Sequence, residues 1–119
     1  MCCPPGGENA VIVYTTKTGN KKDIEDSKQI NFILKLEKIE FTVRDISADS
    51  GYRNELKEVL GKKDIKVPVV FVKGRLIGGA AEVDKMDKEG KLEILFHGIP
   101  KFYDELPRFY TVKEEDSSA

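Results

Sequence analysis

The chemistry open to this chain is limited first by its thiols. The chain has 119 residues, and its two cysteines are the adjacent Cys2 and Cys3. Adjacent cysteines cannot reach ordinary disulfide geometry without severe backbone strain, and two cysteines with one histidine are too few for a four-ligand zinc site. We therefore expect neither a stapling disulfide nor a metal site, and we predict a reducing compartment, most simply the cytoplasm. Cys2 and Cys3 remain as the candidate redox thiols.

A second group of candidate residues surrounds a proline. Val67-Pro68 opens an apolar, β-branched run that extends to Val72. Proline cannot donate a hydrogen bond to a sheet, so it is tolerated mainly at the first positions of a strand, where a cis bond would be a selected feature. Taken alone, Pro68 is also explained by an ordinary strand start. Gly78-Gly79 ends the apolar segment that follows, and a helix is expected from Ala81.

The elements that must position these residues alternate between strands and helices. Unbroken β-branched runs are typical of strands buried on both faces of a sheet, and apolar residues at helical spacing predict helices. The order of elements predicts an α/β fold with a four-stranded mixed sheet flanked by helices, its first two strands parallel and its last two an antiparallel hairpin. The expected strands are 10–16, 39–46, 67–72 and 75–77, and the expected helices are 22–37, 49–60 and a third from residue 81.

Charge and composition define the domain and exclude some partners. The 20 basic and 21 acidic residues give a net charge of -1, which argues against a nucleic-acid-binding protein. No apolar run approaches the ~20 residues of a membrane span. We expect a disordered leader over 1–9, one domain over 10–99, and a partly disordered tail over 100–119. Within that tail, Phe102 and Tyr103 are expected to pack back on the domain.

The run from Val67 to Phe71, followed by GRLIGG at 74–79, closely resembles the second half of a glutaredoxin, which has the thioredoxin-like fold. In that family a cis-proline follows valine, and a Gly-Gly pair opens the last helices. The resemblance covers roughly residues 9–99 and implies a glutathione groove, in which the start of the last helices receives a carboxylate. The implied ligand-binding residues are Lys21, Val67, Pro68, Gly78, Gly79, Ala80, Ala81 and Glu82.

The first half of the chain departs from the family pattern. Where glutaredoxins have Cys-Pro-x-Cys, this chain has Ile24, Glu25, Asp26 and Ser27. Thiol–disulfide exchange needs a thiolate, and a serine hydroxyl without an adjacent base is not activated. Two groups without the motif are also similar to this chain: the Src-homology-3-binding glutamic-acid-rich-like adaptors, and the glutaredoxin-like proteins of plants and of animal sensory hair cells.

These observations favour a non-enzymatic binding or adaptor module with an unidentified protein partner. Its glutathione groove would be partly retained, so that glutathione binds weakly and no cofactor is required. One alternative is an atypical glutathione-dependent thiol–disulfide oxidoreductase that uses Cys2 or Cys3. Another is a glutathione-sensing or dimerising domain without turnover.

Overall fold

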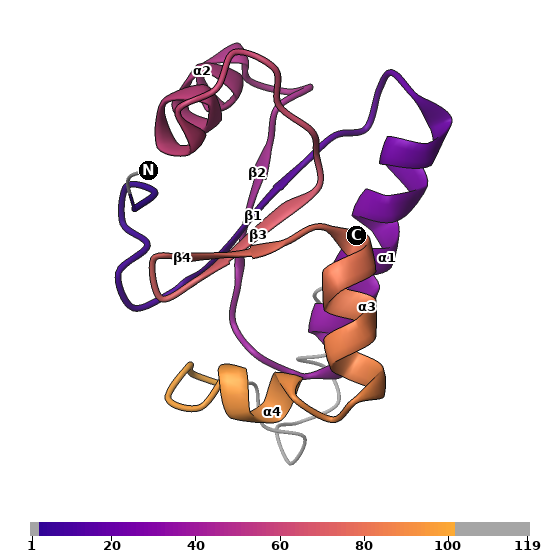
Figure 1. Cartoon of the computed structure of the whole chain (residues 1–119), viewed down its shortest axis with the longest axis vertical. Coiled ribbons are helices and arrows are strands. Elements are labelled where there is room, and N and C mark those ends of the chain that lie inside the picture. Colours follow the sequence, from indigo (N-terminus) through magenta and orange to yellow (C-terminus); the bar gives the residue numbers. More distant parts are fainter. Residues whose placement is uncertain (1–2, 102–119) are drawn as a thin grey trace, which may run out of the picture.

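The computed structural model describes residues 3–101 and contains a four-stranded mixed sheet (Figure 1). The strand order is β2-β1-β3-β4; β1 runs parallel to β2 and antiparallel to β3, and β3 and β4 form an antiparallel hairpin. This arrangement confirms the predicted fold class. The elements are β1 (Val11–Thr15), α1 (Lys21–Leu36), β2 (Thr42–Asp45), α2 (Ser50–Leu60), β3 (Val69–Val72), β4 (Arg75–Gly78), α3 (Ala80–Lys88) and α4 (Leu92–Leu95).

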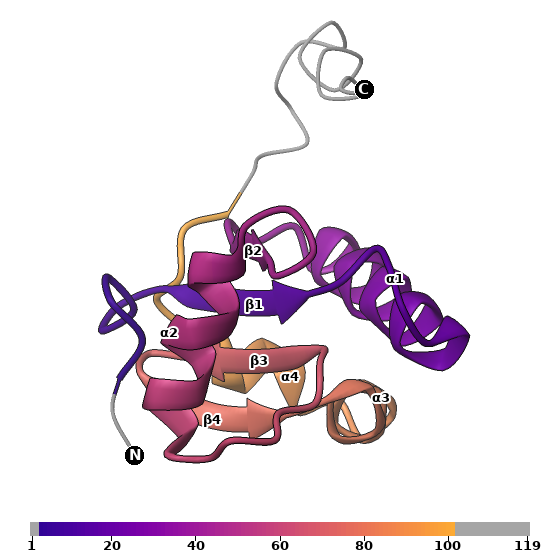
Figure 2. The same cartoon turned by 90° about the horizontal axis from the view of Figure 1, so that it is seen from above.

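The two faces of the sheet bury separate apolar clusters, because alternate residues of each strand point to opposite faces. Val11 and Val13 of β1 face a cluster built with α1, α3 and α4, whereas Ile12 and Tyr14 face a cluster built with α2. In Figure 2, α2 lies across one face while α1 and α3 lie together at the opposite side. Since all five residues of β1 are buried, the unbroken apolar run is explained by a central strand.

Side chains and glycine fix the helix ends. The Asn20 side chain accepts a hydrogen bond from the Lys22 amide at 2.8 Å, and Asp49 caps α2 in the same way through the Gly51 amide. Helix α2 ends at Gly61, whose φ of 69° is left-handed and therefore favours glycine. The predicted helix starts at residues 22 and 49 thus lie within one residue of the observed ones.

The amino-terminal segment differs from the expected disordered leader. Within residues 3–9, Pro4 and Gly7 are buried, and the Gly7 amide donates to the Pro4 carbonyl at 2.9 Å. Arg44 of β2 donates to the Pro5 carbonyl at 2.6 Å. The segment is therefore attached to the sheet by contacts that its turn-forming composition does not reveal. Cys2 lies outside the described residues.

The carboxyl-terminal boundary also extends slightly past the expected domain end at residue 99. The Glu40 amide donates to the Pro100 carbonyl at 2.8 Å, and Ile39 forms an antiparallel bridge with Lys101. The expectations for Phe102, Tyr103 and the rest of the tail lie outside the described residues. Among residues 3–101, no helix combines the length and apolar character needed to cross a bilayer.

Candidate binding groove

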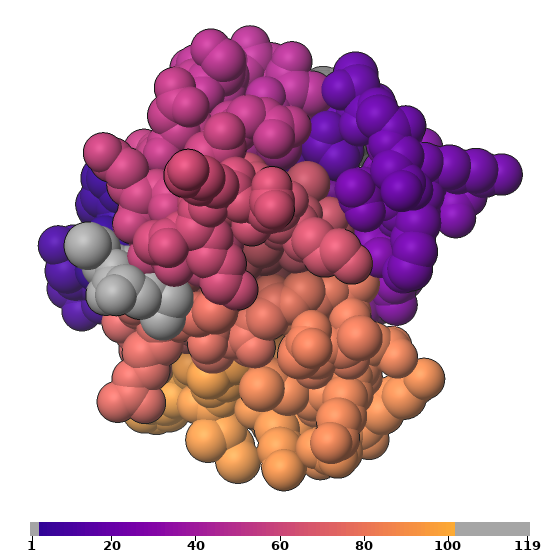
Figure 3. Space-filling view, turned by 45° about the horizontal axis from the view of Figure 1, so that its top comes forward, coloured from indigo at the N-terminus to yellow at the C-terminus, as the bar shows by residue number. Residues whose placement is uncertain are grey.

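A groove of about 620 Å³ lies where the start of α1, the α2–β3 connection and the start of α3 meet. Figure 3 shows the face on which these three parts of the chain come together. The groove contains seven of the eight ligand-binding residues implied by the sequence; Lys21 is the exception. The seven are Val67, Pro68, Gly78, Gly79, Ala80, Ala81 and Glu82.

Val67 and Pro68 bring main-chain groups to this groove. Both residues are buried, and the peptide bond between them is cis. A Cβ placed on Gly79 would lie 3.1 Å from the Pro68 carbonyl oxygen, so the two main chains approach closely here. Glycine at position 79 permits this approach, and the result is a wall of the groove formed largely by backbone.

Glu82 closes the turn that leads into α3. Its carboxylate accepts a hydrogen bond from the Gly79 amide at 2.8 Å, and this bond lowers the pKa of the carboxyl. The carboxylate therefore carries its negative charge at the rim of the groove. The Ala80 and Ala81 amides occupy the first turn of α3, where the helix itself supplies no acceptors. They are the donors that a ligand carboxylate could reach.

Ile24 and Ser27, which the sequence resemblance predicts at the positions of the missing cysteines, do not line the groove. Helix α1 begins at Lys21, so Ile24 lies one turn inside it, and its amide donates to the Asn20 carbonyl at 3.1 Å. Ser27 is buried, and its hydroxyl oxygen accepts a hydrogen bond from the Thr16 amide at 3.2 Å. Ser27 thus joins α1 to the end of β1. Among the described residues that line the groove, there is no cysteine, serine or histidine.

Of the two adjacent lysines at the start of α1, Lys22 lines the groove, whereas the sequence implied Lys21. Lys22 lies 2.7 Å from Asp26, and this hydrogen bond raises the pKa of the lysine. Lys21 points elsewhere, with its ammonium 4.0 Å from Glu25 and its side chain 88% exposed. Successive residues of a helix are separated by about 100°, so a shift of one residue changes the face. Both lysines have an acidic residue four positions later, so charge spacing gave no signal that distinguishes them.

Sequence reasoning also missed the lysines of the α2–β3 connection. Lys62 and Lys66 line the groove, together with the carboxylates of Asp64 and Asp84. Neither lysine belongs to a motif, because their position depends on how the connection folds back beside Val67. Together with Lys22, whose ammonium is paired with Asp26, they are the cationic groups that line the groove.

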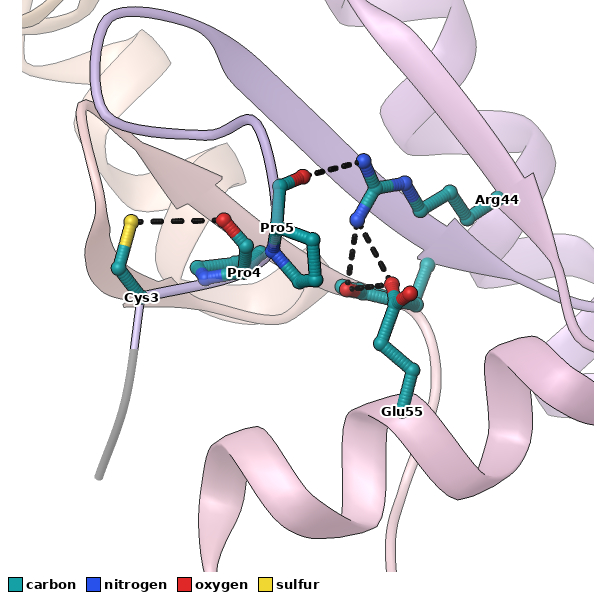
Figure 4. A network of polar contacts seen from close by, with 6 residues as sticks. Cys3, Pro4, Pro5, Arg44 and Glu55 are labelled. Atoms are coloured by element: carbon teal, nitrogen blue, oxygen red, sulfur yellow. Dashed lines mark hydrogen bonds and ion pairs between the residues drawn. The ribbon is translucent and has the colours of Figure 1, made fainter.

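Cys3 lies at the far end of β4 from the groove. A Cβ on Gly74, in the β3–β4 turn, would approach the Cys3 sulfur to 2.9 Å, whereas the part of β4 that lines the groove is Leu76 and Gly78. The thiol is exposed and donates to the Pro4 carbonyl at 3.4 Å (Figure 4). Arg44 bridges this segment to Glu55 of α2, at 2.7 Å. Cys3 therefore lies at the surface, in the segment 3–9 that precedes β1. We call this segment the amino-terminal strap.

Comparison with known proteins agrees with this architecture. The glutaredoxin family matches residues 11–77, which is more than half of the chain. The chain belongs to the glutaredoxin family. An uncharacterized protein of Arabidopsis thaliana is 40% identical to this glutaredoxin-family chain over 101 residues, which cover 81% of the chain and 24% of that protein. A glutaredoxin domain-containing cysteine-rich protein of Drosophila melanogaster is 35% identical over 86 residues, which cover 71% of the chain and 15% of that protein.

The glutaredoxin-family chain thus spans a quarter or less of these two relatives. Among solved structures, a buckwheat glutaredoxin–glutathione complex superimposes with a TM-score of 0.55 and 19% identity, covering 73% of this chain and 76% of the other. At that identity the likeness concerns the fold. The groove described above must therefore be argued from its own residues.

Proposed function

We propose that this glutaredoxin-family domain is a binding module without thiol–disulfide turnover, and that its groove takes glutathione or a similar carboxylate-bearing peptide weakly. In the cell the module would serve a protein partner. The proposal rests chiefly on one observation: the main-chain wall of the groove is present, while the residue at the nucleophile position, Ile24, lies inside a helix and outside the groove.

The chemistry of exchange supports the non-enzymatic half of this proposal. Exchange requires a thiolate in line with the bound disulfide. The sequence has no cysteine beyond residue 3, and Cys3 lies near Gly74, at the opposite end of β4 from Gly78. Reactive thiols are commonly held at a helix amino terminus, whereas Cys3 belongs to the segment that precedes β1.

The composition of the groove supports weak binding. The Ala80 and Ala81 amides attract a carboxylate by ~0.3–1 kcal/mol at an exposed site, and Lys22, Lys62 and Lys66 add positive charge. The carboxylates that line the groove outnumber these lysines and oppose a negatively charged ligand: Asp23, Asp26, Asp64, Glu82 and Asp84. Because repulsion offsets much of the attraction, we expect a dissociation constant in the millimolar range, about -4 kcal/mol, that is sensitive to salt.

A titration with reduced glutathione, followed by amide chemical shifts, tests the binding half. We expect shifts at Val67 and at residues 78–82, and we expect Lys66→Ala to weaken binding about threefold or more because it removes a groove cation. Lys21→Ala is the matched control, since Lys21 is exposed and does not line the groove. If these amides do not move at ~10 mM ligand, a concentration that covers the expected affinity, the groove does not bind glutathione.

A mixed-disulfide reduction assay tests the other half. The wild-type chain and a Cys2→Ser/Cys3→Ser variant should both show only the uncatalysed rate. Turnover that survives in the double variant would contradict the proposal, and turnover lost in that variant would identify the amino-terminal thiols as catalytic.

A further inference from the structure

Helix α1 carries an exposed apolar pair near its carboxyl-terminal end. Phe32 and Leu36 are each 62% exposed. They are four residues apart, so their side chains are neighbours on one face of the helix. The opposite face of α1 is buried in the core through Ile30, Ile33 and Leu34. The exposed pair is therefore not part of the core of the described chain, and adjacent exposed apolar side chains of this size commonly mark a contact surface.

The described chain ends next to this surface. Lys101, its last residue, forms an antiparallel bridge with Ile39, which lies three residues after Leu36. Because the bridge is antiparallel, a chain continued in its register beyond Lys101 would run past the end of α1 and away from β2. Lys101 also counteracts the rise in the pKa of the Glu37 carboxyl that burial and Asp87 cause.

The following segment has a composition that suits this surface. Phe102 and Tyr103 come directly after Lys101, and Asp104 and Glu105 come next. Over 102–119 the sequence has five acidic and two basic residues. The helical neighbours of Phe32 and Leu36 include Lys28 and Lys35, both exposed. The two aromatic side chains suit the apolar pair, and the two carboxylates suit the lysines beside it.

The distances are short compared with the length of the segment. From the level of Leu36 to that of Phe32 is one helical turn, about 5.4 Å. An extended chain covers this in about two residues. The 18 residues after Lys101 are therefore more than sufficient, and the aromatic residues nearest to Lys101 are the ones within reach.

We propose that the carboxyl-terminal segment of this chain docks in cis on α1, with Phe102 and Tyr103 against Phe32 and Leu36 and with Asp104 and Glu105 near Lys28 and Lys35. The segment covers the apolar face that the domain leaves exposed, on a surface separate from the groove.

Tryptophan fluorescence of the full chain tests this docking, because the natural sequence has no tryptophan. In Tyr103→Trp, the indole should be protected from acrylamide quenching by about twofold or more relative to a free tryptophan amide, since it is packed against apolar side chains. Adding Phe32→Asp and Leu36→Asp should remove that protection. Leu76→Asp is the matched control, because Leu76 is 40% exposed and lies on β4, which is at the other edge of the sheet from β2.

A charge variant provides a second measurement that does not depend on the apolar pair. Lys28→Glu with Lys35→Glu should increase the quenching of the indole introduced at position 103 by repelling the two carboxylates, and Lys85→Glu on α3 should not. An indole as accessible as the free amide, or protection that persists in both sets of α1 variants, would overturn the proposal. Protection that appears only as the protein concentration rises would also overturn it, because the occupant would then be a second copy.

Discussion

Position 24, where the sequence resemblance places the missing cysteine, lies inside α1 and not at its first turn. The Ile24 amide is already bonded to the Asn20 carbonyl, and the free amides of α1 belong to the preceding turn. Asp23, Glu25 and Asp26 surround the same position in sequence. A thiolate there would meet carboxylates rather than unpaired helix amides. Restoring the cysteine therefore does not by itself restore the chemistry.

We expect Ile24→Cys to have a thiol pKa at or above the ordinary value of about 8.5, because neighbouring carboxylates favour the neutral thiol. The pH dependence of alkylation, measured in a Cys2→Ser/Cys3→Ser background, gives this pKa. Glutathionylation of the introduced thiol should accordingly be slow at neutral pH. A thiol pKa well below about 7 would show that the site retains the electrostatics of an active glutaredoxin.

Tyr14 lies in the apolar cluster between the sheet and α2, and its hydroxyl group belongs to a polar network. Its buried hydroxyl donates to Glu55 and accepts from Arg44, at 3.1 Å from the guanidinium nitrogen. Burial, followed by the hydrogen bond to Glu55, raises the pKa of Tyr14 to about 12. The ring also makes an edge contact with Phe71, with 5.9 Å between centroids. The network joins β1, β2 and α2.

The raised pKa predicts a loss of stability at alkaline pH. The folded-state pKa lies above the unfolded value of about 10, so the unfolded chain loses its proton first as the pH rises. The contribution is complete below pH ~10 and is lost by about pH 12, up to about 2–3 kcal/mol of unfolding free energy. Tyr14→Phe should flatten this part of the stability curve relative to wild type. Equal slopes for both proteins between pH ~10 and ~12 would contradict this assignment.

The turn between β4 and α3 is the element that shapes the groove. Gly78 has a φ of 135°, and a Cβ there would lie 2.7 Å from Cγ of Glu82. Alanine would therefore strain the backbone and displace the side chain that caps Gly79. The Ala80 and Ala81 amides follow this turn directly. A change in the geometry of the turn therefore also moves the amides that would donate to a ligand carboxylate.

Gly78→Ala should lower the unfolding free energy by about 2–3 kcal/mol, measured by urea denaturation. Gly90→Ala is the matched control, because its φ of 72° is also positive but its Cβ would not approach other described residues within 4 Å. That variant should cost only about 1 kcal/mol. Equal losses in the two variants would mean that the clash with Glu82 is relieved without cost.

The sequence predicted where the helices and strands lie better than it predicted which of their side chains are exposed. The run at 10–16 and the alternation of helices and strands define the sheet because burial on both faces leaves an unbroken apolar signal. The expected strand 39–46 shortens to Thr42–Asp45, and the apolar Val43 within it is 43% exposed. An edge strand is only partly covered, so alternation alone does not determine its burial.

The residues of the candidate site were also only partly predictable from the sequence, for a different reason. Val67, Pro68 and the Gly78-Gly79 turn form a local pattern, and the structure brings them into one groove. The choice between Lys21 and Lys22 depends on the rotation of a helix, which a motif does not specify. Residues such as Lys62 and Lys66 reach the groove through tertiary folding of a connection, and neighbouring sequence gives no signal for that.

For the molecule as a whole, three surfaces are separated by the sheet and its helices. The groove lies beside the starts of α1 and α3, the amino-terminal strap lies near Gly74 and Arg44, and the described chain ends beside the α1–β2 connection (Figure 2). A change at one surface should therefore affect another only through global stability. Truncations of the carboxyl terminus should therefore be detected through the free energy of unfolding.

We expect deletion of 111–119 to leave the unfolding free energy unchanged, because this stretch lies beyond the aromatic residues at the start of the segment. Deletion of 102–119 should lower it by about 1–3 kcal/mol, the value of burying apolar side chains such as Phe102 and Tyr103. Deletion of 101–119 should lower it further, since the Lys101–Ile39 bridge is lost as well. Urea denaturation at several protein concentrations measures all three. Equal stability of the first two truncations would place the boundary of the folded unit at Lys101, because the aromatic residues would then contribute nothing to it.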